Sequence, residues 1–234
     1  MTREELLLQN YQQINLALQS ACRISGRKPD EVSLMAVTKY AADSDVLFLL
    51  EKGLITHVGE SRVGQAWARW KNPAFAKFPV VKHFIGHLQK NKAAKAAELF
   101  DFIDSLDSFS TAQALEKHLP AGKMIRALVQ VKLTDRETQS GLSLPEARQL
   151  ASRLKTLQQV RVGGYMGIAP QGAPEADLRR LFRQVNDAFK QDFPVGTERY
   201  LSLGMSEDFT VAVEEGSSLP RIGSGLFAKN LEVL

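Results

Sequence analysis

Hydrophobic and polar residues alternate along the chain in short blocks, and these blocks predict strands that take turns with helices. Eight runs are rich in β-branched and other apolar residues, which is typical of strands in a buried sheet. The first run, V-S-L-M-A-V-T-K, ends in Lys39, and the helix-start residues Asp43 and Ser44 follow it. In chain order the predicted strands are 32–39, 55–60, 80–86, 102–106, 125–133, 160–168, 200–203 and 220–222.

Apolar residues spaced three and four apart predict a helix before the first strand and helices between the others. Ser61 is a suitable N-cap, as is Ser110 or Thr111, and Gly53 is a suitable stop after a helix. The predicted helices are 4–21, 43–52, one from Ser61 to 70, 91–99, one from Ser110 or Thr111 to 118, 144–155, 174–189 and 208–215.

The alternation of eight strands with helices predicts an α/β fold: a single (β/α)8 TIM-type barrel with an extra N-terminal helix. We expect one domain over residues 1–234, because barrels of this kind commonly reach that length. A doubly wound open sheet stays possible, since periodicity does not separate the two folds. The count of eight strands and the length favour the barrel.

Composition narrows the class of protein. Cys22 is the only cysteine, so an intrachain disulfide is impossible and a reducing compartment fits best. The N-terminus lacks the apolar core of a secretory signal, and no run of 18 apolar residues occurs, so we expect a cytoplasmic protein without membrane contact. No Cys/His cluster has metal-ligand spacing, and no Walker loop or G-x-S-x-G elbow occurs, so we expect no metal site.

Lys39 lies where the first strand meets the next loop, at the edge where α/β barrels bind ligands. A neutral lysine amine can form a Schiff base with a carbonyl compound. A lysine at a strand end is by itself weak support for such chemistry, because polar residues commonly end strands. Further residues at the same edge are needed to indicate a site.

Two loops at that edge have residues suited to an anion, and barrels often hold phosphate in the loops after strands seven and eight. The first loop, S-L-G-M-S-E-D, places Ser206 at the start of a predicted helix, where backbone N–H groups face an anion. The second, R-I-G-S-G, has Gly223 and Ser224 in a segment that can form a backbone nest. Either loop alone is as readily a simple turn. Together with Lys39 they indicate a ligand site.

Arg221 lies in the eighth strand, so we expect it to point towards the barrel mouth or core. A buried arginine needs a partner. That partner is either a group on a ligand, such as a ring nitrogen or carboxylate, or a barrel acid such as Glu60 or Asp104. His83, inside the third strand, is more often a satisfied core residue than a ligand contact.

Lys82, Lys90, Lys92 and Lys95 form a basic cluster that could contact RNA or an acidic partner. Aromatic residues do not alternate with these lysines, so a solvated helix face is the favoured interpretation. The net charge of +4 is mild and is compatible with an anionic ligand. We therefore expect no nucleic-acid partner.

Several motifs resemble those of the pyridoxal phosphate homeostasis proteins. They are A-V-T-K at 36–39, H-F-I-G-H-L-Q-K-N-K at 83–92, S-L-G-M-S-E-D at 202–208 and R-I-G-S-G at 221–225. Gly-Glu at 59–60 and Ser-Gly at 140–141 agree with the same family. The resemblance runs over nearly the whole chain. It implies the pyridoxal 5′-phosphate (PLP) barrel of the alanine racemase N-terminal domain, known as PLP fold type III.

The resemblance also implies roles for individual residues. Lys39 would hold PLP as a Schiff base. Arg221 would approach the pyridine nitrogen, and its charge would disfavour protonation there and weaken the ring as an electron sink. Ser61 stands where family members commonly have asparagine, so its contact with the cofactor could be lost or pass to water. The other implied contacts are Ser206, Gly223 and Ser224 for the phosphate, and Met166, Met205 and His83 around the cofactor.

The family is understood to bind PLP and to act in vitamin B6 and amino/keto-acid balance without established turnover. The chain extends only about ten residues past the 221–225 loop, so we expect no second domain and an open site. The expected partners are PLP and PLP-accepting or regulatory proteins, and the expected state is a monomer. The alternatives are a PLP-dependent amino-acid racemase or lyase, and a PLP-responsive interaction module that uses the basic cluster.

Overall fold

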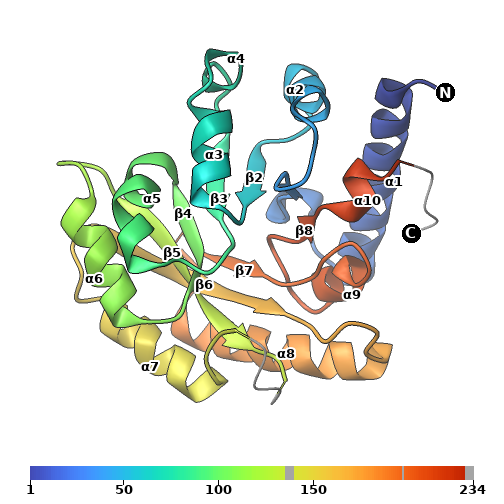
Figure 1. The fold of residues 1–234 in the computed structure, drawn as a ribbon. Coiled ribbons are helices and arrows are strands. Elements are labelled where there is room, and N and C mark those ends of the chain that lie inside the picture. Colours follow the sequence, from blue (N-terminus) through green and yellow to red (C-terminus); the bar gives the residue numbers. More distant parts are fainter. Residues whose placement is uncertain (135–139, 197, 230–234) are drawn as a thin grey trace.

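The computed structural model describes residues 1–134, 140–196 and 198–229, which form a barrel of parallel strands surrounded by helices (Figure 1). The strand order is β7-β6-β5-β4-β3-β2-β1-β8, so neighbours in the chain are also neighbours in the sheet except at β8, which pairs with β1. The strands are β1 (Met35–Val37), β2 (His57–Glu60), β3 (Val81–Phe84), β4 (Phe102–Leu106), β5 (Ile125–Lys132), β6 (Val160–Ile168), β7 (Tyr200–Ser202) and β8 (Arg221–Ile222).

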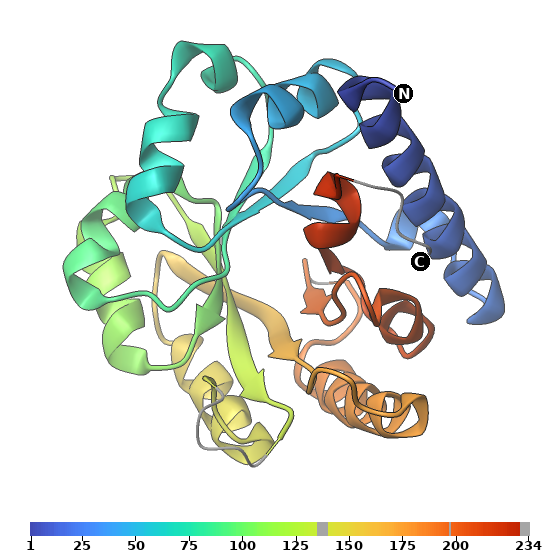
Figure 2. The same cartoon turned by 45° about the vertical axis from the view of Figure 1, so that its right-hand side comes forward.

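Backbone hydrogen bonds close the sheet between its two end strands, β7 and β8. The N–H of Leu219 donates to the carbonyl of Leu201 (3.1 Å), and the N–H of Arg221 donates to the carbonyl of Gly204 (3.0 Å). The ring of helices around the strands is plain in Figure 2. The predicted TIM-type barrel is therefore confirmed. The doubly wound alternative is wrong, because that fold reverses its strand order at a switch point.

Helices cover the outside of the barrel, and each predicted helix is present with shifted ends. Within the described residues, none of the helices is long and apolar enough to cross a membrane. The helices are α1 (Arg3–Ile24), α2 (Asp43–Glu51), α3 (Val63–Trp70), α4 (Pro73–Ala76), α5 (Ala93–Leu99), α6 (Phe109–His118), α7 (Leu144–Leu154), α8 (Glu175–Asp192), α9 (Phe209–Glu214) and α10 (Ser224–Phe227), with 3₁₀ turns η1 (Pro29–Glu31) and η2 (Lys90–Lys92).

The N-terminal helix α1 completes the outer layer of helices beside β8, which only the short α10 follows. It packs against α2, α9 and α10. The Asn10 side chain donates to the carbonyl of Leu226 (3.2 Å), and Arg3 pairs with Asp45 on α2 (2.6 Å). A capping box fixes its start, because Thr2 Oγ1 accepts from the Glu5 N–H and a Glu5 carboxylate oxygen accepts from the Thr2 N–H.

Among the predicted element ends that differ from the structure, those of β1, α6 and α3 have a clear local cause. Strand β1 covers only part of the predicted 32–39, because the chain turns where the Ala41 N–H donates to the Thr38 carbonyl. Ser108 caps α6, so Ser110 and Thr111 lie inside that helix. Ser61 does not cap α3, which starts at Val63 after Arg62.

Candidate functional site

A cavity of about 850 Å³ opens at the carboxyl ends of the strands. It is lined by the loops that follow β1, β6, β7 and β8, together with residues after β2 and β3. This edge of a parallel barrel is where ligands bind, because the βα loops converge there. Eight of the nine predicted contacts line the cavity: Lys39, Ser61, Met166, Met205, Ser206, Arg221, Gly223 and Ser224.

Lys39 lies in the turn that directly follows β1. Its side chain is half-buried, and its Nζ lies 5.2 Å from the centre of the Tyr40 ring. Val37, two residues before Lys39 on β1, also lines the cavity. The short strand thus delivers the amine to the cavity from a position that the barrel backbone fixes.

The loops after β7 and β8 are joined to each other. The Ser206 hydroxyl accepts a hydrogen bond from the backbone N–H of Gly225 (3.1 Å). Ser206 does not begin a helix as predicted, because Asp208 is the N-cap of α9 and its carboxylate accepts the Met205 N–H (2.6 Å), which closes a tight turn. Two loops predicted as separate anion contacts therefore form one unit.

Gly223 and Gly204 each lie close to atoms that a side chain at the same position would meet. A Cβ on Gly223 would lie 3.3 Å from the Cβ of Val37, a tight contact beside the cavity. Gly204 has φ of +87°, and a Cβ there would meet the backbone of Phe209 at 2.8 Å. Glycine at these positions lets the two loops turn close to the strand ends.

Arg221 is buried at the base of the cavity, and its charge is held by oxygen atoms of the barrel. Nη1 donates to the carbonyl (2.7 Å) and hydroxyl (2.8 Å) of Ser202, and Nη2 donates to the carbonyl of Gly167 (2.8 Å). Burial lowers the pKa of Arg221 to about 10, so the side chain remains a cation at neutral pH.

The two barrel acids considered as partners of Arg221 are bound elsewhere. Glu60 pairs with Arg69 (2.8 Å), and Asp104 pairs with His83 (3.0 Å). Among the described residues no carboxylate lies within ion-pair distance of Arg221. The alternative in which Arg221 forms a salt bridge with Glu60 or Asp104 is therefore wrong.

His83 is the predicted contact that the structure does not bring to the cavity. Its ring is fully buried inside the barrel, stacked on Phe102 with ring centres 4.4 Å apart. Its Nδ1 lies 3.0 Å from an Asp104 oxygen, and its Nε2 lies 2.9 Å from Nδ1 of His57. These partners account for both ring nitrogens, so His83 belongs to a polar network in the barrel core.

The loop after β6 supplies cavity residues that the sequence analysis missed. Gln171 belongs to this loop, Ile168 ends β6 just before it, and Tyr40 and Phe227 also line the cavity. The signal available in the sequence was position alone, since residues that follow a predicted barrel strand lie at the ligand-binding edge.

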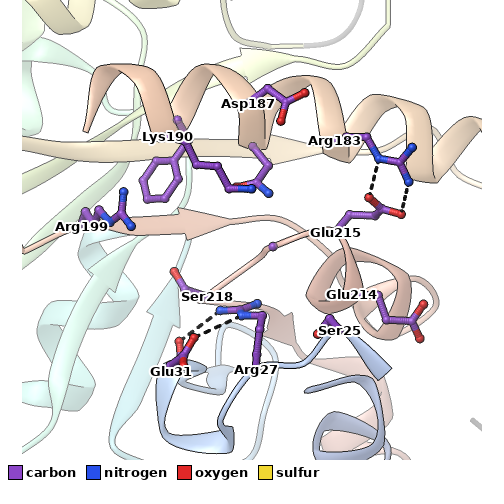
Figure 3. A pocket seen from close by; sticks show the side chains of 13 residues that line it. Ser25, Arg27, Glu31, Arg183, Asp187, Lys190, Arg199, Glu214, Glu215 and Ser218 are labelled. Atoms are coloured by element: carbon purple, nitrogen blue, oxygen red, sulfur yellow. Dashed lines mark hydrogen bonds and ion pairs between the residues drawn. The ribbon is translucent and has the colours of Figure 1, made fainter. Parts of the chain in front are cut away.

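A second cavity, of about 680 Å³, lies at the opposite, amino end of the strands (Figure 3). Four of its charged residues form two ion pairs with one another. Arg183 bonds to Glu215 (2.9 Å), and Arg27 lies 3.6 Å from Glu31. Because none of the predicted contacts lines it, the cavity at the carboxyl ends is the candidate functional site.

The basic cluster predicted around η2 is partly engaged within the protein. Lys82 donates to the Val80 carbonyl (3.1 Å) and lies 3.4 Å from Asp101, while Lys95 lies over the Trp67 ring at 5.6 Å. The hypothesis of an acidic partner for this cluster stays a prediction. In the described part of the chain no group of three or more His, Cys, Asp or Glu side chains could hold a metal ion.

The fold and the site together define a class of protein: a parallel barrel that binds a ligand at the carboxyl ends of its strands. In this class a lysine follows the first strand, and the loops after the seventh and eighth strands contain glycine and serine and contact each other. The family model for the alanine racemase N-terminal domain matches residues 17–230, and the chain belongs to this family.

Individual relatives match the chain over most of its length. The chain is 33% identical over 229 residues to the pyridoxal phosphate homeostasis protein of Escherichia coli K12, covering 93% of this chain and 94% of that one. It is 32% identical to PipY of Synechococcus elongatus PCC7942, whose structure has PLP bound, with a TM-score of 0.76 over 91% of this chain and 100% of that one. A structure of an unknown protein from Bifidobacterium adolescentis is 26% identical, with a TM-score of 0.84 over 96% and 95% of the two chains.

Proposed function

We propose that this protein binds PLP as a Schiff base on Lys39 and acts in vitamin B6 homeostasis, without enzymatic turnover of its own. The observation that carries the proposal is the convergence of Lys39, Arg221 and the joined loops around Ser206 and Ser224 on one cavity of about 850 Å³. The names of its relatives, and the PLP in PipY, support the same reading.

The residues present match the chemical groups of PLP. PLP supplies an aldehyde that reacts with an amine, and an aromatic ring that withdraws electrons. We assign the amine of Lys39 to the aldehyde. The hydroxyl of Ser224, the backbone around Gly223 and the Ser206 loop would hold the phosphate, because N–H and O–H donors on a glycine nest suit that anion.

We assign Arg221 to the pyridine nitrogen. Within the described residues its three hydrogen bonds use Nη1 twice and Nη2 once. The Nε–H and the second N–H of Nη2 are therefore the donors that could face the ring. A cationic side chain at this nitrogen keeps it unprotonated, which weakens the ring as an electron sink. That effect favours holding PLP over carbanion chemistry.

Met166, Met205 and Ser61 line the same cavity and would contact the cofactor ring. Ser61 is shorter than the asparagine expected there, so we propose that water mediates its contact. His83 has no place in this assignment, because its ring nitrogens are committed to His57 and Asp104.

The rival function is a PLP-dependent racemase or lyase, which needs an acid or base in addition to Lys39. Apart from Lys39 and Arg221, the ionisable residues that line the described cavity are Tyr40, Glu207 and Asp208. Burial raises the pKa of Asp208, but its carboxylate accepts the Met205 N–H and closes the loop. Tyr40 is 78% exposed. Glu207 is exposed as well. None of these three side chains is placed for proton transfer shielded from water, so a weak racemase activity is the second candidate.

We further propose that the chain is a monomeric, single-domain cytoplasmic protein that passes PLP to acceptor proteins or signals PLP supply to regulatory ones. Pull-downs with the apo and PLP-loaded forms test the signalling version. Partners recovered preferentially from one form support it, and equal recovery from both contradicts it.

The absorption spectrum during a PLP titration tests the binding proposal. Wild-type protein is expected to develop a visible band that borohydride abolishes, and Lys39→Ala is expected to lack that band. Lys52→Ala, which removes an exposed lysine after α2, is the control and should behave as wild type. A band that persists unchanged in Lys39→Ala contradicts the proposal. Racemisation of amino acids by the loaded wild type at a rate above free PLP would favour the second candidate.

A further inference from the structure

Arg69, on α3, reaches from outside the cavity into the backbone that carries Lys39. Its side chain is mostly buried, and it is absent from the residues that line the cavity. Its Nη1 donates to the carbonyl of Thr38 (2.8 Å), and its Nη2 donates to the carbonyl of Ala41 (2.8 Å). One guanidinium therefore forms hydrogen bonds to the backbone on both sides of Lys39 and Tyr40.

Two carboxylates hold Arg69 in place. Nη1 also donates to Glu60 (2.8 Å), which is only 1% exposed, and Nε donates to Asp43 (2.8 Å) at the start of α2. Charge-assisted hydrogen bonds of this kind are about twice as strong as neutral ones. The planar fork of arginine suits four fixed acceptors, which a lysine ammonium does not match.

Glu60 ties the same assembly to the strand. It accepts from the Thr38 hydroxyl (2.7 Å) and the Trp70 indole N–H (3.3 Å) as well as from Arg69. Thr38 is thus bound through its hydroxyl to Glu60 and through its carbonyl to Arg69. A buried carboxylate with several donors is rigid, because leaving any partner unpaired is costly.

We propose that Arg69 is a positioning residue that fixes the Lys39 turn so that the lysine amine points at the aldehyde carbon of a bound pyridoxal ligand. This rests on the proposed function of the cavity. Arg69 touches neither the phosphate loops nor Arg221. Its removal should therefore impair reaction at Lys39 while leaving recognition of the phosphate and ring unchanged.

Binding of two ligands distinguishes a role of Arg69 in positioning Lys39 from a role in stabilising the fold alone. PLP has the aldehyde that Lys39 attacks, whereas pyridoxine 5′-phosphate has an alcohol in its place and depends on the loops and Arg221 alone. In Arg69→Gln we expect PLP affinity and the rate of borohydride-trapped adduct formation to fall about tenfold or more, since two charged hydrogen bonds to the turn are lost. Affinity for pyridoxine 5′-phosphate should stay within about twofold of wild type.

Arg69→Lys and Arg148→Gln complete the series. Arg69→Lys keeps the charge beside Glu60 but reaches fewer acceptors, so its adduct rate should fall between those of wild type and Arg69→Gln. Arg148 pairs with Asp192 (2.8 Å), and neither residue lines the cavity, so Arg148→Gln should match wild type.

Hydrogen exchange of the apo protein tests the turn without any ligand. The Ala41 N–H donates to Thr38 (3.0 Å) across the turn that Arg69 holds. In Arg69→Gln this amide should exchange about tenfold faster or more, while amides of the central strand β5 keep their wild-type rates. This readout stays decisive if wild type fails to bind PLP, an outcome that defeats the proposed function alone.

Three results would overturn the positioning role. The first is unchanged exchange at Ala41 in both Arg69 variants. The second is an equal loss of affinity for PLP and pyridoxine 5′-phosphate, because that result would mean that Arg69 only stabilises the fold. The third is faster exchange with an unchanged rate of adduct formation. If Arg69→Gln does not fold, the same comparisons with Arg69→Lys decide the question.

Discussion

His57 lies at the start of β2, where its half-buried ring meets His83 inside the barrel (2.9 Å between ring nitrogens). Burial, and then the nearby His83, lowers the pKa of His57 to about 4. His83 in turn contacts Asp104, so a row of three polar side chains crosses the core without reaching the cavity. The charged form of His57 is therefore unfavourable in the folded protein.

This burial predicts a pH dependence of stability. The unfolded chain binds a proton at His57 near pH 6.5, whereas the folded chain does so only near pH 4. Between these values the unfolded state binds more protons, so the free energy of unfolding should fall as the pH falls from 6.5 to 4, by roughly 1–3 kcal/mol from this group. Urea denaturation across that pH range measures the effect.

His57→Gln isolates the contribution of His57, because other groups also titrate in this range. The variant should show a shallower decrease in stability between pH 6.5 and 4 than wild type. His118→Gln removes an exposed histidine at the end of α6 and should keep the wild-type slope. Equal slopes for wild type and His57→Gln would show that burial does not suppress protonation of His57.

At the scale of elements, α1 acts as a structural part of the barrel wall. Its buried face includes Leu7 and Ile14, both fully buried, while Leu16 on the opposite face is 65% exposed. Leu7→Ala should lower the free energy of unfolding by about 2–5 kcal/mol, because it removes a packed side chain and leaves a cavity. Urea denaturation of the full chain measures this loss.

Leu16→Ala is the matched control on the same helix, with the same change in side chain and little burial. Its effect should stay within about 0.5 kcal/mol of wild type, as for most surface substitutions. Similar losses for both variants would mean that α1 does not pack as described.

Hydrophobic patterning predicted the elements well, and their ends poorly. The eight apolar runs mark the eight strands because parallel barrel strands are buried on both faces. The ends depend on contacts that no local pattern contains. Thr38 leaves β1 because Arg69 and Glu60 hold the turn, and Ser206 lies outside α9 because Asp208 caps that helix.

At the scale of the whole molecule, eight of the nine predicted site residues come from five segments of the chain and meet at one end of the barrel. Loop position and residue type were enough to place Lys39, Ser206 and Ser224 there. They were not enough to show that His83 is a core residue and not a cavity contact, because the direction of its side chain is set by the barrel. Nor could they find Arg69, because its contacts are with backbone carbonyls far away in sequence.

We propose that the barrel presents one lysine, Lys39, to a cavity that binds PLP. The most direct measurement is peptide mapping by mass spectrometry after wild-type protein has been loaded with equimolar PLP and reduced with borohydride. We expect a reduced pyridoxyl group on the peptide that contains Lys39, at near-stoichiometric yield. An adduct spread over several surface lysines, or located on a lysine outside the cavity, would contradict it.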